Sequence, residues 1–66
     1  MDFADAMRAV LSGKRVRRLD WGRPHFIEWQ THGEIRMLCM VMRDGRVGPY
    51  TPSGCDMGAS DWTDQI

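Results

Sequence analysis

The residues best suited to hold a ligand gather in one polar stretch, residues 50–62. Pro52, Gly54 and Gly58 exclude a regular strand and a long helix here, because proline donates no backbone hydrogen bond and glycine weakens both structures. The stretch begins at Tyr50 and ends at Trp62, and large aromatic side chains usually bury much of their surface. A polar loop fixed at both ends by aromatic rings is therefore a candidate wall of a binding pocket.

The side chains around this stretch fit a small ligand that carries a planar ring and a phosphate. Aromatic rings can stack on a base, and an arginine, either Arg18 or Arg23, can hold a phosphate. Hydroxyl and carboxylate groups of the loop can bond ribose or base edges, and the candidates are Thr51, Ser53 and Asp56. These residue types predict a class of ligand, a nucleotide-like small molecule.

Arg18 lies in a segment, residues 14–21, that is predicted to be extended. Val16 and Arg18 then share one face of the strand, and a guanidinium group beside the core needs an acceptor. Two interpretations stay open. Either Arg18 reaches into water from a solvated edge strand, or it pairs with a carboxylate of the C-terminal loop or with an anionic ligand.

Metal binding and catalysis are not expected. The chain's histidines and cysteines lack the spacings that are typical of zinc sites, and Cys39 is interpreted as a small buried apolar residue. Ser53 and Cys55 belong to no motif that combines a nucleophile, a base and an oxyanion site. We therefore expect a protein without a cofactor and without enzymatic activity.

Length and composition predict a single small domain, residues 1–66, with a limited core of its own. A chain of 66 residues buries only about 60 % of its unfolded surface, and such domains usually gain stability from disulfides, a metal or a second subunit. Cys39 and Cys55 do not form a disulfide framework, so we expect a homo-oligomer. Without a signal peptide or an apolar run of the roughly 20 residues that span a membrane, we expect a cytoplasmic protein with no membrane partner.

The charge balance argues against nucleic acid as a partner. The chain has nine basic and nine acidic residues and a net charge of zero, whereas general binding of nucleic acid depends on neutralisation of phosphates by Lys and Arg. The basic residues cluster between Lys14 and Arg23, which leaves room for a local basic patch.

The predicted elements are one helix and several short strands. The helix covers residues 2–13, with Asp2 as its N-terminal cap, Gly13 as its end, and an apolar face made of Phe3, Met7, Val10 and Leu11. Strands are predicted at residues 14–21, 25–30, 34–43 and 62–66, with turns at residues 22–24 and 31–33. In the last strand, the alternating residues are Trp62, Asp64 and Ile66.

The Asp44-Gly45 pair predicts a two-residue hairpin turn. Its register would pair Arg43 with Arg46, Met42 with Val47, and Cys39 with Tyr50. The Gly48-Pro49 pair indicates that the returning strand lies at an edge or soon leaves the sheet.

Residues 34–43 carry apolar side chains on both faces of their predicted strand, which indicates that both faces are covered. The single helix covers one face, and a second subunit is expected on the other. The predicted fold is therefore α+β and oligomeric, with one N-terminal helix packed on a small antiparallel sheet.

Two spaced motifs resemble the Thoeris anti-defence two family of phage proteins. The first, Gly-Lys-x-Val-x-Arg-x-x-Trp, spans residues 13–21, and the second, Pro-Ser-x-x-Asp-x-x-Ala-x-Asp-Trp, spans residues 52–62. Together with their neighbours they cover about half of the chain. The chain differs from the family pattern at Gly22 and Tyr50, and it has a shorter segment between Trp21 and the hairpin.

The resemblance implies a small α+β fold assembled as a dimer or tetramer. It implies a non-enzymatic sponge that sequesters a cyclic nucleotide-type immune signal in an infected or lysogenic bacterial host. The signal would be a cyclic ADP-ribose isomer or, as in anti-CBASS members, a cyclic oligonucleotide. The alternative is an anti-CRISPR protein that binds a Cas effector complex directly. By motif position, the implied ligand-binding residues are Arg18, Trp21, Tyr50, Thr51, Asp56 and Trp62.

A purely structural role is the alternative for these residues. Trp21 and Trp62 would then complete the core, and Asp56 and Asp61 would cap a short turn of helix.

Overall fold

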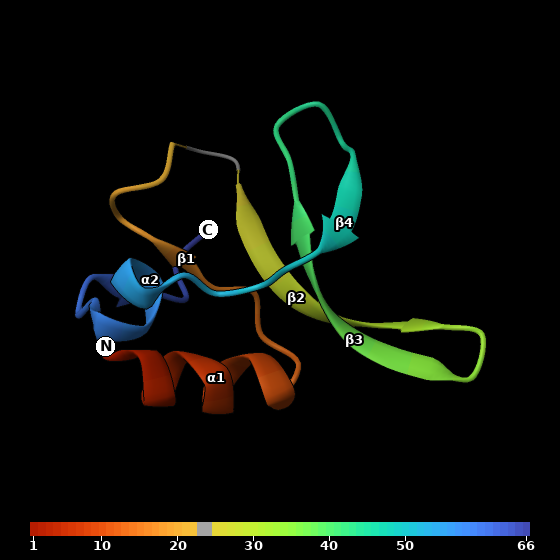
Figure 1. Cartoon of the computed structure of the whole chain (residues 1–66), viewed down its shortest axis with the longest axis horizontal. Coiled ribbons are helices and arrows are strands. Elements are labelled where there is room, and N and C mark those ends of the chain that lie inside the picture. Colours follow the sequence, from red (N-terminus) through yellow and green to blue (C-terminus); the bar gives the residue numbers. More distant parts are fainter. Residues whose placement is uncertain (23–24) are drawn as a thin grey trace.

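The computed structural model describes residues 1–22 and 25–66 and has the α+β architecture that the sequence predicts (Figure 1). The elements in chain order are α1 (Phe3–Leu11), β1 (Arg17–Arg18), β2 (Phe26–His32), β3 (Ile35–Val41), β4 (Val47–Pro49), α2 (Gly54–Gly58) and β5 (Trp62–Thr63). The strands form two antiparallel sheets, one of β1 and β5 and one of β2, β3 and β4, in place of the single sheet predicted, and α2 is a short helix in addition to the predicted one. A single bridge between Val16 and Ile27 connects the two sheets.

Helix α1 begins and ends at the residues that the sequence indicates. The carboxylate of Asp2 accepts the backbone N–H of Asp5 at 2.8 Å and caps the first turn. After the helix, Gly13 adopts a φ of +101°, and the N–H of Lys14 bonds the carbonyl of Ala9 at 3.0 Å. This is a Schellman-type ending, which requires the positive φ that glycine adopts without strain.

The core lies where α1 packs across the two sheets. Its buried residues come from every layer of the fold: Ala6, Val10, Val16, Ile27 and Trp62. The backbone of β5 is also joined to the start of the chain, because the Met1 amino group donates to the Trp62 carbonyl at 2.8 Å and the Trp62 N–H donates to the Met1 carbonyl at 3.2 Å. The N-terminus and β5 are thereby held side by side.

Strands β1 and β5 are shorter than predicted. The chain turns directly after β1, where the N–H of Trp21 bonds the carbonyl of Arg18 at 3.0 Å. At the other end, Asp64 and Ile66 lie beyond β5 and do not continue the alternation. Strand β1 ends early because the turn after it is held by Asp61, whose carboxylate accepts the backbone N–H of Asp20.

The first hairpin differs from the prediction in the position of its turn. Thr31 and His32 are part of β2, and the two turn residues are Gly33 and Glu34. Gly33 has a φ of +65° and occupies the first central position, which is where type II′ hairpin turns place glycine. This hairpin extends away from the body of the molecule (Figure 1). The predicted turn at residues 22–24 includes Arg23 and Pro24, which lie outside the described residues.

The second hairpin shows that the predicted register was wrong by one residue. Val41 pairs with Val47, Met40 with Gly48, and Cys39 with Pro49, so Arg43 does not face Arg46, Met42 does not face Val47, and Cys39 does not face Tyr50. The Met42 N–H bonds the Arg46 carbonyl at 2.8 Å, and Gly45 has a φ of +88°. The loop therefore has three residues and ends with a left-handed glycine, a common alternative to the two-residue turn.

The position of Tyr50 explains this register of β3 and β4. Its backbone N–H bonds the carbonyl of Leu38 at 2.9 Å, and both residues pack against the core cluster. A two-residue turn would place Tyr50 opposite Cys39, on the other face of the sheet. Strand β4 lies at the edge of its sheet, as the Gly48-Pro49 pair predicts.

Replacing Gly45 by alanine tests this loop. A Cβ at Gly45 meets no atom within 4 Å, so the cost comes from the positive φ alone. We expect the free energy of unfolding to fall by about 1–2 kcal/mol in urea titrations followed by tryptophan fluorescence. The control is Gly54→Ala in α2, where the space is equally open and φ is not positive. An equal loss in both variants would contradict the proposed loop conformation.

The outer face of the three-stranded sheet is only partly covered. Cys39 is buried there, as predicted, while Ile35 is 65 % exposed and Val47 is 48 % exposed. The second subunit expected on this face stays a prediction. Within residues 1–22 and 25–66, no helix is long and apolar enough to cross a membrane.

Candidate functional site

Arg18 connects the two parts of the chain that carry the predicted site. Its Nε donates to Asp61 Oδ1 at 2.9 Å, and its Nη1 donates to Asp56 Oδ1 at 3.1 Å. The Arg18 side chain is only 16 % exposed. Of the two interpretations that the sequence leaves open, pairing with carboxylates of the C-terminal loop is therefore confirmed.

Asp56 is positioned by the start of α2. Ser53 is the N-terminal cap of this helix, and its Oγ accepts the N–H of Asp56 at 3.1 Å. In return Asp56 Oδ2 accepts the N–H of Ser53 at 3.4 Å, which completes a capping box. The Tyr50 hydroxyl donates to the same Oδ2 at 2.7 Å. Asp56 therefore caps the helix and also holds Arg18 and Tyr50.

Asp61 fixes the other side of the Arg18 guanidinium group. Its Oδ2 accepts the N–H of Asp20 at 3.1 Å, and its backbone carbonyl accepts the N–H of Leu19 at 3.0 Å. Through these bonds the turn after β1 is attached to the residue before β5. Arg18, Asp56, Asp61 and Tyr50 form one hydrogen-bonded group, which we call the Arg18 cluster.

Two further aromatic side chains, Trp21 and Trp62, lie against this cluster. Trp21 meets Tyr50 edge to face, with ring centroids 5.9 Å apart, and it meets Trp62 at 5.2 Å in the same manner. The indole Nε1 of Trp62 donates to the carbonyl of Asp56 at 3.1 Å. Trp62 is 2 % exposed and belongs to the core, whereas the rings of Trp21 and Tyr50 are half-buried.

The contacts in the Arg18 cluster fix the charge of each member. The hydrogen bond from Arg18 lowers the pKa of Asp61. Burial works against ionisation of Asp56, but hydrogen bonds from Tyr50, Arg18 and Ser53 outweigh it and lower its pKa. Burial, together with the bond to Asp56, raises the pKa of Tyr50 well above its usual range. At neutral pH the cluster therefore holds two carboxylates, one guanidinium group and one protonated phenol.

Five of the six residues implied by the resemblance are brought together. Arg18, Tyr50 and Asp56 are hydrogen-bonded, and Trp21 and Trp62 pack beside them. Thr51 follows Tyr50 and is exposed to solvent. Asp56 also has the capping role that the structural alternative assigns to it. Arg23, the second candidate for a phosphate contact, lies outside the described residues.

The burial of Arg17 is a feature of the site that the sequence does not predict. This residue is only 6 % exposed. Because side chains alternate along a strand, Arg17 points to the opposite side from its neighbour Val16, which lies in the core. Its Nη1 donates to the carbonyls of Arg18 and Trp21 at 3.3 and 3.4 Å, and its buried Nε has no partner among the described residues. The turn after β1 folds back over Arg17, and local sequence patterns carry no signal for that contact.

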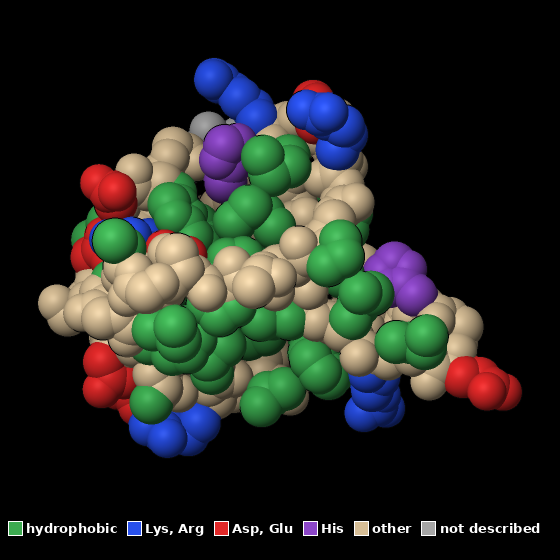
Figure 2. Space-filling model, in the orientation of Figure 1, with side chains coloured by type: hydrophobic (Ala, Val, Ile, Leu, Met, Phe, Trp, Pro, Cys, Tyr) green, Lys and Arg blue, Asp and Glu red, His purple; other side chains and the backbone are tan. Residues whose placement is uncertain are grey.

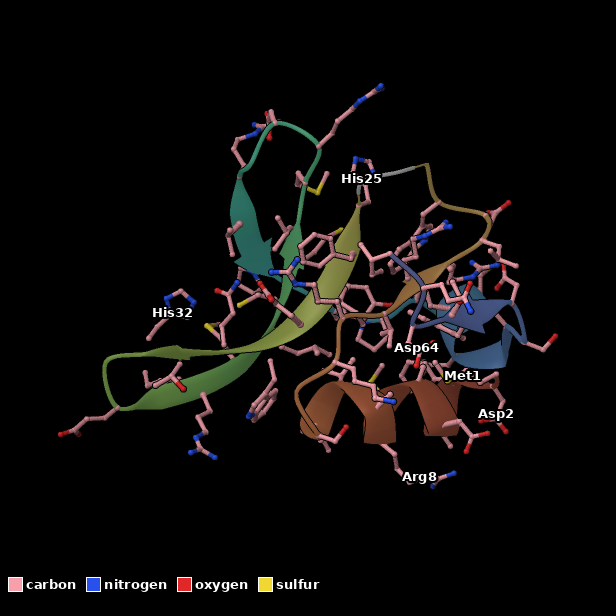
Figure 3. The ribbon with its side chains drawn as sticks, turned by 180° about the vertical axis from the view of Figure 1, so that it is seen from behind. Met1, Asp2, Arg8, His25, His32 and Asp64 are labelled. Carbon is pink, nitrogen blue, oxygen red and sulfur yellow. The ribbon has the colours of Figure 1, made fainter. Side chains whose placement is uncertain are left out.

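The histidines and cysteines do not assemble with one another into a catalytic or metal site among the described residues. His25 and His32 lie near opposite ends of β2 (Figure 3). The Cys39 sulfur lies 3.7 Å from His32 Nε2, but Cys39 is 1 % exposed, and Cys55 is exposed. In the described part of the chain, no group of three or more His, Cys, Asp or Glu residues is arranged to hold a metal.

Comparison with known families gives one match that covers almost the entire chain. The sequence model of the Tad2-like domain, described as the Thoeris anti-defense 2-like domain, matches residues 1–64. A comparison with the curated proteins finds no match.

Proposed function

Because the chain belongs to the Thoeris anti-defense 2-like domain family, we propose that it binds a cyclic nucleotide-type immune signal and sequesters it without cleavage. Membership in this family supports a phage anti-defence role. The observation that carries the ligand class is the placement of two half-buried aromatic rings, Trp21 and Tyr50, beside a rigid hydrogen-bonded cluster. Rings held in this way stack on a nucleobase with little loss of conformational entropy on binding.

The Arg18 cluster supports this proposal by fixing the rings before a ligand arrives. The Tyr50 hydroxyl is held by Asp56, and Asp56 is held by Arg18 and by the capping box of α2. Tight capture depends on such preorganisation, because ordering of the protein otherwise subtracts from the affinity. The exposed hydroxyl of Thr51 adds a polar group next to Tyr50.

The charges of the cluster favour binding over cleavage. A general acid or base works best with a pKa near the operating pH, whereas the pKa values of Asp56 and Asp61 are lowered and that of Tyr50 is raised. None of these three groups exchanges a proton readily near neutral pH. They are suited to hold a ligand and poorly suited to transfer its protons.

The proposal includes a second copy of the chain. A ligand as large as a cyclic dinucleotide needs more enclosure than two half-buried rings provide, and a second chain beside these rings would supply it. The exposed Ile35 and Val47 lie on the opposite face of the sheet from Tyr50 and offer apolar surface for a separate contact between chains. In a homo-oligomer, stacking and polar contacts would come from two chains. A protein that stays strictly monomeric at micromolar concentration would contradict this part of the proposal.

Titration calorimetry with cyclic ADP-ribose isomers and with cyclic di- and trinucleotides tests the ligand class. We expect one class to bind, and we expect Trp21→Leu to weaken that binding by about 5- to 150-fold, since stacking contributes about 1–3 kcal/mol per base. The matched control is Trp29→Leu, because Trp29 is 37 % exposed and is not part of the Arg18 cluster. If no member of the panel binds and the protein co-purifies with a Cas effector complex, the anti-CRISPR alternative replaces this proposal.

A further inference from the structure

The β3–β4 hairpin contains a hollow that lies apart from the Arg18 cluster. It has a volume of about 310 Å³ and is lined by His25, Met42, Arg43, Asp44 and Arg46. This volume is at the lower end of the range that small-molecule sites usually have. Its position shows that the molecule offers a second concave surface, outside residues 13–21 and 52–62.

The hollow follows from the register of the two hairpins. Strand β2 pairs with β3 only as far as Phe26 and Val41. The β3–β4 hairpin continues beyond that pair, with the Met42 N–H bonded to the Arg46 carbonyl at 2.8 Å. The hairpin end therefore projects past the start of β2, where His25 lies (Figures 1 and 3).

The charges around the hollow leave an excess of positive charge. Asp44 Oδ2 lies 2.7 Å from Arg46 Nε, and Asp44 Oδ1 accepts the Arg46 N–H at 3.1 Å. Asp44 thus orients Arg46 and compensates one guanidinium charge. Arg43 has no carboxylate within 4.0 Å among residues 1–22 and 25–66. Basic side chains and a histidine also gather at this end in Figure 2.

We propose that this hollow binds the phosphate group of a small phosphorylated molecule that also carries a planar ring. Arg43 supplies the uncompensated positive charge, and guanidinium groups bind phosphate oxygens through paired, charge-assisted hydrogen bonds. The imidazole of His25 offers a ring face and an N–H donor. The Met42 side chain, half-buried in the same hollow, offers a polarisable apolar contact for a ring.

The Arg18 cluster is less suited to a phosphate than this hollow. Arg18 already donates to two carboxylates, and the cluster carries one positive and two negative charges. A phosphate placed there would meet a net negative charge. The assignment of the phosphate site to the hairpin rests on these local charges and does not depend on the proposed immune signal.

Amide chemical-shift titrations with AMP, adenosine and inorganic phosphate test the assignment. We expect AMP to shift the resonances of residues 42–46 and His25, and to bind at least tenfold more tightly than adenosine. Inorganic phosphate should shift the same resonances with weaker affinity. Arg43→Gln should weaken AMP binding roughly tenfold, because it removes a charge-assisted hydrogen bond. Arg36→Gln, which removes the same charge from an exposed site on β3, should change the affinity less than twofold.

Two results would overturn the assignment. The first is that millimolar AMP leaves the hairpin resonances unchanged or shifts mainly those of Trp21 and Tyr50. The second is that Arg36→Gln weakens binding as much as Arg43→Gln, which would mean non-specific attraction to positive charge. The same spectra report whether each variant is folded. Because AMP and phosphate are the probes, failure here is distinct from failure of any cyclic ligand to bind.

Discussion

Trp62→Ala is expected to leave a large fraction of the protein unfolded at 25 °C. Trp62 is 2 % exposed and contacts the rings of Phe3 and Trp21 at centroid distances of 5.8 and 5.2 Å. Truncation of a buried tryptophan costs about 3–5 kcal/mol, which is close to the entire stability that a domain of this size usually has. The variant also loses the indole hydrogen bond to the Asp56 carbonyl.

Far-ultraviolet circular dichroism and urea titration measure this loss. Trp29→Ala is the control, since that side chain is 37 % exposed and Trp62 is 2 % exposed, so its removal should cost clearly less than the removal of Trp62. Trp62→Phe should fall between the two, because it retains an apolar ring but loses the N–H donor. If Trp62→Ala were as stable as Trp29→Ala, the core described for this fold would be wrong.

Arg18→Gln is expected to have the second largest effect, and the effect depends on pH. The substitution leaves Asp56 and Asp61 close together without the cation that bonds both. Because these side chains are only 13–31 % exposed, the loss of one partner is expected to destabilise the fold more than the loss of an exposed pair does. The exposed pair of Arg8 and Asp5 provides the matched control. Arg8→Gln should change the urea midpoint little, because exposed salt bridges contribute little to stability.

The sign of the pH effect follows from the lowered pKa values of Asp56 and Asp61. Groups of this kind stabilise the fold above their unfolded pKa of about 3.9, and the contribution is lost as the pH falls through the folded pKa. The wild-type protein should therefore lose stability below about pH 4. Arg18→Gln removes the main cause of the lowered pKa of Asp61 and one of the causes of the lowered pKa of Asp56, so its deficit in stability should be largest at pH 7 and shrink toward pH 3.

A combined variant separates charge from packing. If unpaired carboxylates cause the lower stability of Arg18→Gln, adding Asp56→Asn and Asp61→Asn to this variant should recover part of its stability at pH 7. Urea midpoints at pH 3 and pH 7 provide the comparison. A deficit of Arg18→Gln that is equal at both pH values would mean that the guanidinium group contributes mainly by packing.

Local patterns in the sequence were sufficient to predict helix α1 and one key contact of the candidate site. The caps at Asp2 and Gly13 and the apolar spacing define the helix without reference to the rest of the fold. The contact between Arg18 and the C-terminal carboxylates was predictable because a guanidinium group beside the core needs an acceptor. The acidic residues of the stretch 50–62 were the most suitable candidates for that acceptor.

Features that depend on tertiary contacts were not predictable in the same way. The Asp44-Gly45 pair fits a two-residue turn and also a three-residue loop that ends in a left-handed glycine. The choice depends on Tyr50, whose ring belongs on the core face beside Leu38. The burial of Arg17 depends on the turn after β1 folding back over it, and the early end of β1 depends on the bond from Asp20 to Asp61.

The most direct test of the proposed sponge is recovery of the bound molecule. A cyclic ADP-ribose isomer or cyclic oligonucleotide that binds in calorimetry is incubated with the protein for several hours, and the protein is then denatured by heat. Chromatography of the supernatant should return the intact cyclic ligand in an amount equal to the amount bound. A linear or otherwise cleaved product that accumulates beyond the molar amount of protein would contradict sequestration and would identify the protein as an enzyme.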